Sequence, residues 1–79
     1  MENTRLIKKL KKGDQKTFKE VYLVYFDRLV HVARKFEFKF LTPEDFVQET
    51  FLHLYKQKQL LKEDVLFDKQ LFVICKNII

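Results

Sequence analysis

The sequence predicts an all-α domain, folded as a compact bundle of about four helices. Three observations favour this fold class. One Gly and one Pro among 79 residues leave little room for strands and tight turns. The helix formers Leu, Lys, Glu and Gln are abundant. Hydrophobic residues make up 47% of the chain, with nine Phe and three Tyr, so a core can form although a domain this small buries only about 60% of its unfolded surface. We expect one domain, residues 1–79.

The first helix is expected over residues 5–12. Asn3 or Thr4 can cap its start, and Gly13 can end it because glycine tolerates the left-handed geometry after a helix. Its inward-facing residues are Leu6, Ile7 and Leu10. Its lysines are Lys8, Lys9, Lys11 and Lys12. These lysines could stabilise the negative C-terminal end of the helix dipole, or they could bind phosphate groups. We favour the interaction with the helix dipole.

A long second helix is expected over residues 15–36, with Asp14 as its cap. Its aromatic and apolar residues recur at alternating spacings of four and three, the pattern of a seam between nearly antiparallel helices. They are Phe18, Tyr22, Tyr25, Leu29, Val32 and Phe36. We therefore predict that this stripe lies in the core.

The third helix, predicted over residues 43–59, has the clearest start signal in the chain. Thr42 can cap the free N–H groups, and Pro43 suits the first helical position. Glu44 and Asp45 then place negative charge at the positive end of the helix. The connection before it, residues 37–41, holds Phe38 and Phe40, either of which could pack on the first turn.

A helical wheel divides the third helix into two faces. The apolar face consists of Phe46, Val47, Thr50, Phe51 and Leu54. The other face consists of Asp45, Gln48, Glu49, Leu52, Tyr55, Lys56 and Gln59. Carboxylates and amides can pair with basic groups of a partner, and Leu52 and Tyr55 add apolar area. The face is either a binding surface or an ordinary solvated face with two apolar residues.

A polar break, residues 60–66, precedes a last helix predicted over residues 68–79. Leu71, Ile74 and Ile78 should face the core together with Phe67. Lys69 and Lys76 should lie on the opposite side, where they suit phosphate.

Positive charge is concentrated in the first half of the chain. The net charge is +5; residues 1–20 hold seven basic and three acidic groups, which gives +4, and residues 41–60 hold two basic and three acidic groups, which gives −1. A basic region beside a slightly acidic helix suits two differently charged partners, although charge alone does not indicate nucleic acid.

Several classes of protein are not indicated. The single Cys75 cannot form an internal disulfide and suits a small core position. No signal-peptide core and no apolar run of about 20 residues is present, so we expect a cytoplasmic protein that does not enter a membrane. With no Ser, no Gly-rich phosphate loop, and isolated His31 and His53, we expect neither enzyme activity nor a metal or other cofactor.

Three runs of residues resemble bacterial RNA polymerase sigma factors of the extracytoplasmic-function class. Residues 45–55, Asp-Phe-Val-Gln-Glu-Thr-Phe-Leu-His-Leu-Tyr, resemble the family's D-x-V-Q-E-x-F-x-x-x-[WY] run in region 2.2. Gly13-Asp14-x-x-x-Phe18-x-x-x-Tyr22 is similar to its G-D-x-x-A-F-x-x-L-Y opening, with Thr17 and Val21 where Ala and Leu are usual. Residues 67–77 resemble its F-x-x-W-L-x-x-I-A-R-N run of regions 2.3 and 2.4, with Gln70 where Trp is usual.

The resemblance implies a region 2 domain with two binding surfaces. Region 2.2 grips the clamp helices of the polymerase beta-prime subunit, which implies contacts from Asp45, Gln48 and Glu49; the wheel adds Leu52 and Tyr55. The loop before the last helix, together with that helix, contacts the non-template strand of the minus-ten promoter element. The DNA-binding residues expected here are Lys62, Glu63, Asp64, Phe67, Lys69, Gln70 and Lys76. An anti-sigma factor is a further expected partner.

The resemblance covers roughly residues 6–79. The family's region 4 is not part of it, and the family's last helix continues beyond the position of Ile79, so we expect a truncated domain that does not start transcription alone. The alternative is a helical protein-interaction module or a polymerase-binding decoy with no DNA role. A basic helix-turn-helix protein fits less well, since the acidic third helix would repel phosphate.

Overall fold

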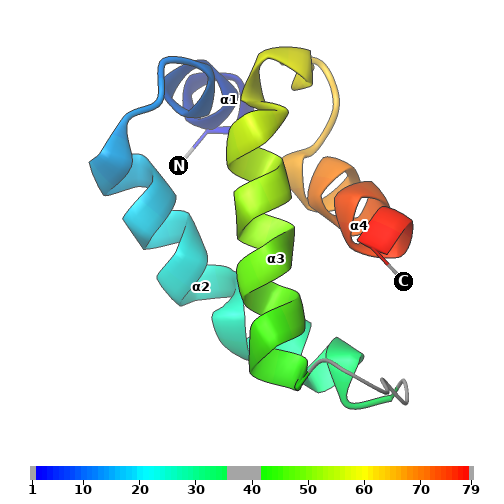
Figure 1. Cartoon of the computed structure of the whole chain (residues 1–79). Coiled ribbons are helices and arrows are strands. Elements are labelled where there is room, and N and C mark those ends of the chain that lie inside the picture. The colour runs from blue at the N-terminus through cyan, green and yellow to red at the C-terminus, as the bar shows by residue number, and fades with distance from the viewer. Residues whose placement is uncertain (1, 36–41, 79) are drawn as a thin grey trace.

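The predicted all-α fold is confirmed over the residues that the structure describes. This computed structural model describes residues 2–35 and 42–78. The helices in chain order are α1 (Asn3–Lys11), α2 (Gln15–Ala33), α3 (Pro43–Lys56), the single 3-10 turn η1 (Lys58–Leu60) and α4 (Phe67–Ile78). Figure 1 shows α3 between α2 and α4, with α1 and η1 together at one end of the bundle. α3 packs against both α2 and α4, and is therefore the central helix.

α1 ends at a glycine, as predicted. Gly13 has a φ of 77°, and its N–H donates to the carbonyl of Leu10 while the Asp14 N–H donates to that of Lys9. This pair of bonds is the Schellman pattern, in which a left-handed residue satisfies the last carbonyls of a helix. The predicted cap is different: Glu2 holds the cap position without a side-chain bond, and the Asn3 side chain extends away to the far end of the chain.

α2 buries a different set of residues from the predicted stripe. Among Phe18, Tyr22, Tyr25, Leu29 and Val32, only Leu29 is buried, and the others are half-buried. The buried residues of α2 are Thr17, Val21, Leu29, Val30 and Ala33. Small side chains let the helix backbones approach, so the large rings lie along the edges of the interface rather than at its centre. The predicted stripe therefore faces the core, but Phe18, Tyr22 and Tyr25 pack against it as partly buried rings. Phe36, Phe38 and Phe40 lie outside the described residues.

The start of α3 follows the predicted signal. The Thr42 hydroxyl accepts from the Asp45 N–H at 3.1 Å, and the Asp45 carboxylate accepts from the Thr42 N–H at 3.4 Å, which forms a capping box. α3 ends at Lys56 rather than at Gln59. The chain then tightens into η1, where the Gln59 amide donates to the Lys11 carbonyl at 2.7 Å and joins this turn to the end of α1.

The core is built around the predicted apolar face of α3. All five predicted residues of that face are buried, as are Phe67, Leu71 and Ile74 of α4. Cys75 is buried too; its thiol donates to the Thr50 hydroxyl at 3.8 Å, and burial raises the pKa of the thiol. Cys75 therefore has the structural position that the sequence predicted.

The phase of α3 can be tested with two adjacent residues. Phe51 is 9% exposed and Leu52 is 53% exposed. We expect Phe51→Ala to lower the free energy of unfolding by about 3–5 kcal/mol, because it removes a large core side chain. Leu52→Ala should cost far less. Thermal and urea unfolding of the two variants measures the difference, and the reverse order would contradict this packing.

Candidate functional site

The outer face of α3 carries the five residues predicted to dock on a partner. Asp45, Gln48, Leu52 and Tyr55 are exposed, and Glu49 is half-exposed. They lie on one side of the helix because burial of Phe46, Val47 and Phe51 turns the opposite side outward. The structure therefore brings all five together on one surface, which we call the α3 outer face.

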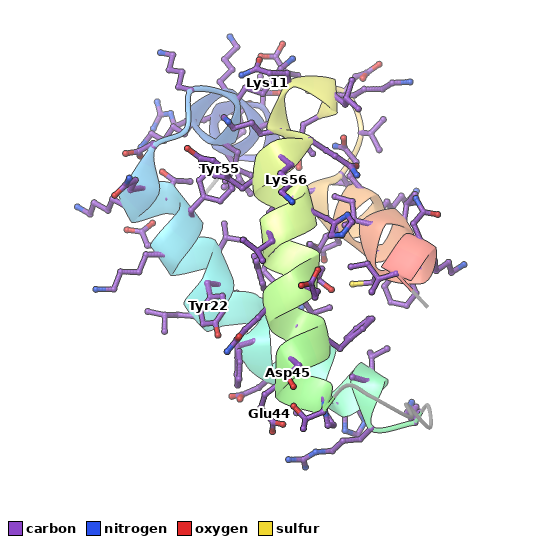
Figure 2. The ribbon with its side chains drawn as sticks, viewed as in Figure 1. Lys11, Tyr22, Glu44, Asp45, Tyr55 and Lys56 are labelled. Atoms are coloured by element: carbon purple, nitrogen blue, oxygen red, sulfur yellow. The ribbon has the colours of Figure 1, made fainter. Side chains whose placement is uncertain are left out.

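A groove between α2 and α3 borders the α3 outer face. The residues that line it are Gln15, Phe18, Lys19 and Tyr22 of α2, and Gln48, Phe51, Leu52 and Tyr55 of α3. Two ring contacts form its floor: Phe18 with Tyr55, at 5.2 Å between centroids, and Tyr22 with Phe51, at 5.0 Å. Figure 2 shows Tyr55 extending from α3 toward α2. The groove is apolar at its floor and polar along its rim, as in many protein-binding surfaces.

Charge is unevenly distributed along the α3 outer face. Glu44 and Asp45 lie at the start of α3, and Lys56 lies toward its other end (Figure 2). Glu49 lies between them, with its carboxylate 3.7 Å from the imidazole of His53. Exposed pairs of this kind contribute little to stability, so the Glu49 carboxylate can exchange His53 for a cationic partner at small cost.

A second exposed surface combines the loop before α4 with the outer side of α4. Lys62, Glu63 and Asp64 are exposed on the loop, and Lys69 and Lys76 are exposed on α4. The Lys76 ammonium lies 5.7 Å from the ring of Phe72, which is itself exposed. The surface holds cations, carboxylates and an accessible aromatic ring.

Two residues of the predicted DNA-binding set have structural roles here. Phe67 is 2% exposed and its ring packs on Tyr25, so its predicted core position is confirmed while its ring has no free surface for a base. The half-buried Gln70 uses its amide to bond the backbone of Lys62 and Val65. Direct contact of Phe67 with a base would require this ring to leave the core.

The start of α4 is attached to α2 through Tyr25. Its hydroxyl donates to the Asp68 carboxylate, which also lies 3.8 Å from the Arg28 guanidinium. The Tyr25 ring meets that of Phe67 edge to face at 5.5 Å. Burial, followed by the bond to Asp68 and the charge of that carboxylate, raises the pKa of Tyr25 to about 12.

Sequence reasoning missed the α2 wall of the groove. Phe18 and Tyr22 were assigned to the core, while Gln15 and Lys19 were given no role. The four residues share one face at spacings of three, four and seven, so an amphipathic edge could have been recognised. Which partner helix that edge would meet follows only from packing.

The described residues hold no cluster of three His, Cys, Asp or Glu side chains suited to a metal ion. Within the same residues, each helix is too short or too polar to cross a membrane.

Comparison of the chain with protein-family models, curated proteins and solved structures found no match. A functional assignment therefore depends on the residues and on their geometry.

The attachment of Tyr25 makes a prediction about alkaline pH. A raised phenol pKa means that folding favours the protonated form, so its contribution is complete below the ordinary value of 10.0 and is lost as pH rises toward about 12. Tyr25→Phe keeps the ring but removes this dependence, so its stability should fall less steeply than wild type between about pH 10 and pH 12. Asp68→Asn should flatten the slope only in part, since burial remains. Urea unfolding at several pH values measures the slopes, and equal slopes for wild type and Tyr25→Phe would contradict the prediction.

Proposed function

We propose that this chain is a sigma factor region 2 domain of the extracytoplasmic-function type. Its α3 outer face docks on the clamp helices of the RNA polymerase beta-prime subunit. The loop of residues 61–66 and the outer side of α4 then meet the non-template strand of the minus-ten element. The chain acts as an adaptor in the cytoplasm, without chemistry of its own, and an anti-sigma factor would compete for the same surfaces.

One observation carries the proposal: the split of residues 45–55 between core and surface. The motif positions that a partner would contact, Asp45, Gln48 and Glu49, are accessible, and the apolar positions Val47 and Phe51 are buried. An ordinary solvated helix face would also be polar, so the exposed Leu52 and Tyr55 beside these residues are what favour a binding surface. The adjoining groove adds apolar area, which a carboxylate face needs for stable docking.

Phosphate and base contacts are supported by the lysines and the exposed ring of α4. Lys69 and Lys76 are exposed on either side of Phe72 in sequence. Single-stranded nucleic acid is bound by such combinations, with cations along the backbone and bases stacked on aromatic rings. Phe72 is an addition to the expected DNA-binding residues.

The protein-only alternative is favoured by one observation. The proposed DNA surface also carries Glu63, Asp64 and Asp68, so its carboxylates are as numerous as its lysines. These carboxylates would repel phosphate. Titration of labelled single-stranded DNA, with and without the clamp helices, separates the alternatives, because a decoy would bind the clamp helices yet gain no DNA affinity from them.

Docking is tested by substitutions on the α3 outer face. Gln48→Ala and Glu49→Lys should both weaken binding to a peptide of the beta-prime clamp helices, with the charge reversal worse. Loss of a buried charged contact typically costs on the order of 2–5 kcal/mol. The helical circular dichroism signal should not change, because neither side chain is in the core.

Two matched controls address nonspecific effects on docking. Glu20→Lys makes the same charge change at an exposed site of α2 outside the groove. Leu23→Ala, at a residue that is 65% exposed, matches Leu52→Ala. Both controls should bind like wild type, whereas Leu52→Ala should bind more weakly. Wild-type affinity in Gln48→Ala and Glu49→Lys would remove the docking assignment.

DNA binding by the isolated chain should be weak, unselective and strongly salt-dependent. Most of the positive charge lies in residues 1–40 rather than in the loop or α4 themselves, so contact would be mainly with phosphate. Lys69→Ala and Lys76→Ala should each lower the salt slope by about one unit, for promoter and scrambled oligonucleotides alike. Fluorescence anisotropy at several salt concentrations measures the slope, with Lys16→Ala as the charge-matched control. Tight, selective and salt-insensitive binding by the isolated chain would contradict the view that docking is required.

A further inference from the structure

The loop of residues 61–66 is held by two side-chain amides from opposite ends of the chain. It contains no helix or strand, and its exposed residues are Lys62, Glu63, Asp64 and Leu66. Between its two ends, which bond to η1 and to α4, the loop has a backbone turn bond from the Val65 N–H to the Lys62 carbonyl, at 3.4 Å. A loop with so little backbone bonding would sample many conformations unless side chains restrained it.

Gln70, in the first turns of α4, bonds one side of the loop. Its Oε1 accepts from the Lys62 N–H at 2.8 Å, and its Nε2 donates to the carbonyls of Lys62 and Val65, each at 2.9 Å. An amide offers one acceptor oxygen and two N–H donors, and this geometry uses all of them. A carboxylate at position 70 could not make the two donations, and an indole ring, with one N–H donor and no acceptor, could make at most one of the three bonds.

Asn3, in the first turn of α1, bonds the other side of the loop. Its Nδ2 donates to the Val65 carbonyl at 2.9 Å and to the Glu63 carbonyl at 3.2 Å. Its Oδ1 accepts from the Phe67 N–H at 2.8 Å, and thereby satisfies the first free N–H of α4. Val65 accepts from both amides, so the two restraints meet at one carbonyl.

We propose that Asn3 and Gln70 are positioning residues that hold the loop in one preformed conformation for base recognition. The inference rests on the proposed function. The two amides bond the Lys62 N–H and the carbonyls of Lys62, Glu63 and Val65, while the exposed side chains of the loop stay accessible to a ligand. A loop ordered before binding discriminates between bases more strongly, because no part of the binding energy is used to order it.

Two substitutions test whether the loop can lose its restraint while the fold stays stable. Asn3→Asp keeps the oxygen that caps α4 and removes both donations to the loop. Gln70→Glu keeps the acceptor for the Lys62 N–H and likewise removes both donations. Gln59→Glu is the matched control, since it adds the same charge and removes a similar amide bond, to Lys11, outside the loop. Asn3→Ala and Gln70→Met repeat the test without added charge.

The experiment has two readouts on the full chain bound to the clamp-helix peptide. The first is backbone order at residues 62–65, from nitrogen-15 relaxation. The second is sequence enrichment from a randomised single-stranded DNA pool, compared with affinity for oligo-dT. We expect Asn3→Asp and Gln70→Glu to loosen the loop and to lower the ratio of selected-sequence affinity to oligo-dT affinity on the order of tenfold. A uniform electrostatic loss cancels in this ratio, and the unfolding temperature should stay near that of Gln59→Glu.

The outcomes distinguish this inference from the proposed function. If the loop stays ordered in both variants, or loosens while enrichment is unchanged, the positioning role is overturned and base recognition stands. If the wild-type complex enriches no sequence at all, base recognition fails, and Asn3 and Gln70 are braces of the fold with no role toward DNA.

Discussion

Burial of one face of α3 is the constraint on which the rest of the structure depends. Phe46, Val47 and Leu54 are fully buried at the centre of the bundle, where α3 packs on both α2 and α4. In a small domain, this shared core contributes most of the apolar burial that offsets chain entropy. Because a helix repeats every 3.6 residues, the same burial fixes the direction of Gln48 and Leu52. The same buried residues therefore stabilise the fold and set the orientation of the α3 outer face.

Side-chain amides supply the connections that the core does not. Gln59 joins η1 to the end of α1, Gln70 bonds the loop before α4, and Asn3 joins the first turn of α1 to that loop and to the start of α4. These bonds link segments up to 64 residues apart. An amide can donate and accept at once, so it can satisfy the carbonyls and N–H groups of an irregular segment that has no ladder of its own. The two candidate surfaces are thus supported by different forces: apolar packing beneath α3, and hydrogen bonds beneath the loop.

Local signals predicted the helices better than they predicted the faces that the helices bury. The start of α3 was correct because Thr42 and Asp45 act within one turn, and the end of α1 was correct because Gly13 alone suits a φ of 77°. The stripe of α2 faces the core as predicted, but the large side chains chosen for it are mostly half-buried. Tyr22 and Tyr25 lie at the interface edge, while the smaller Thr17 and Val21 lie inside it. The spacing of aromatic residues along the sequence does not specify how closely two helices approach each other.

The sequence by itself determined the all-α class, the glycine that ends α1, the cap that starts α3, and the division of α3 into a buried and an exposed face. Each follows from contacts within a turn or from a helical period. Only the tertiary structure decided that Phe18 and Tyr22 border a groove beside Tyr55, that Phe67 has no free surface, and that Asn3 serves the loop rather than its own helix. These outcomes depend on which segments meet across the bundle. The distance between two side chains on different helices is set by the packing of the whole core, and no local pattern of residues encodes it.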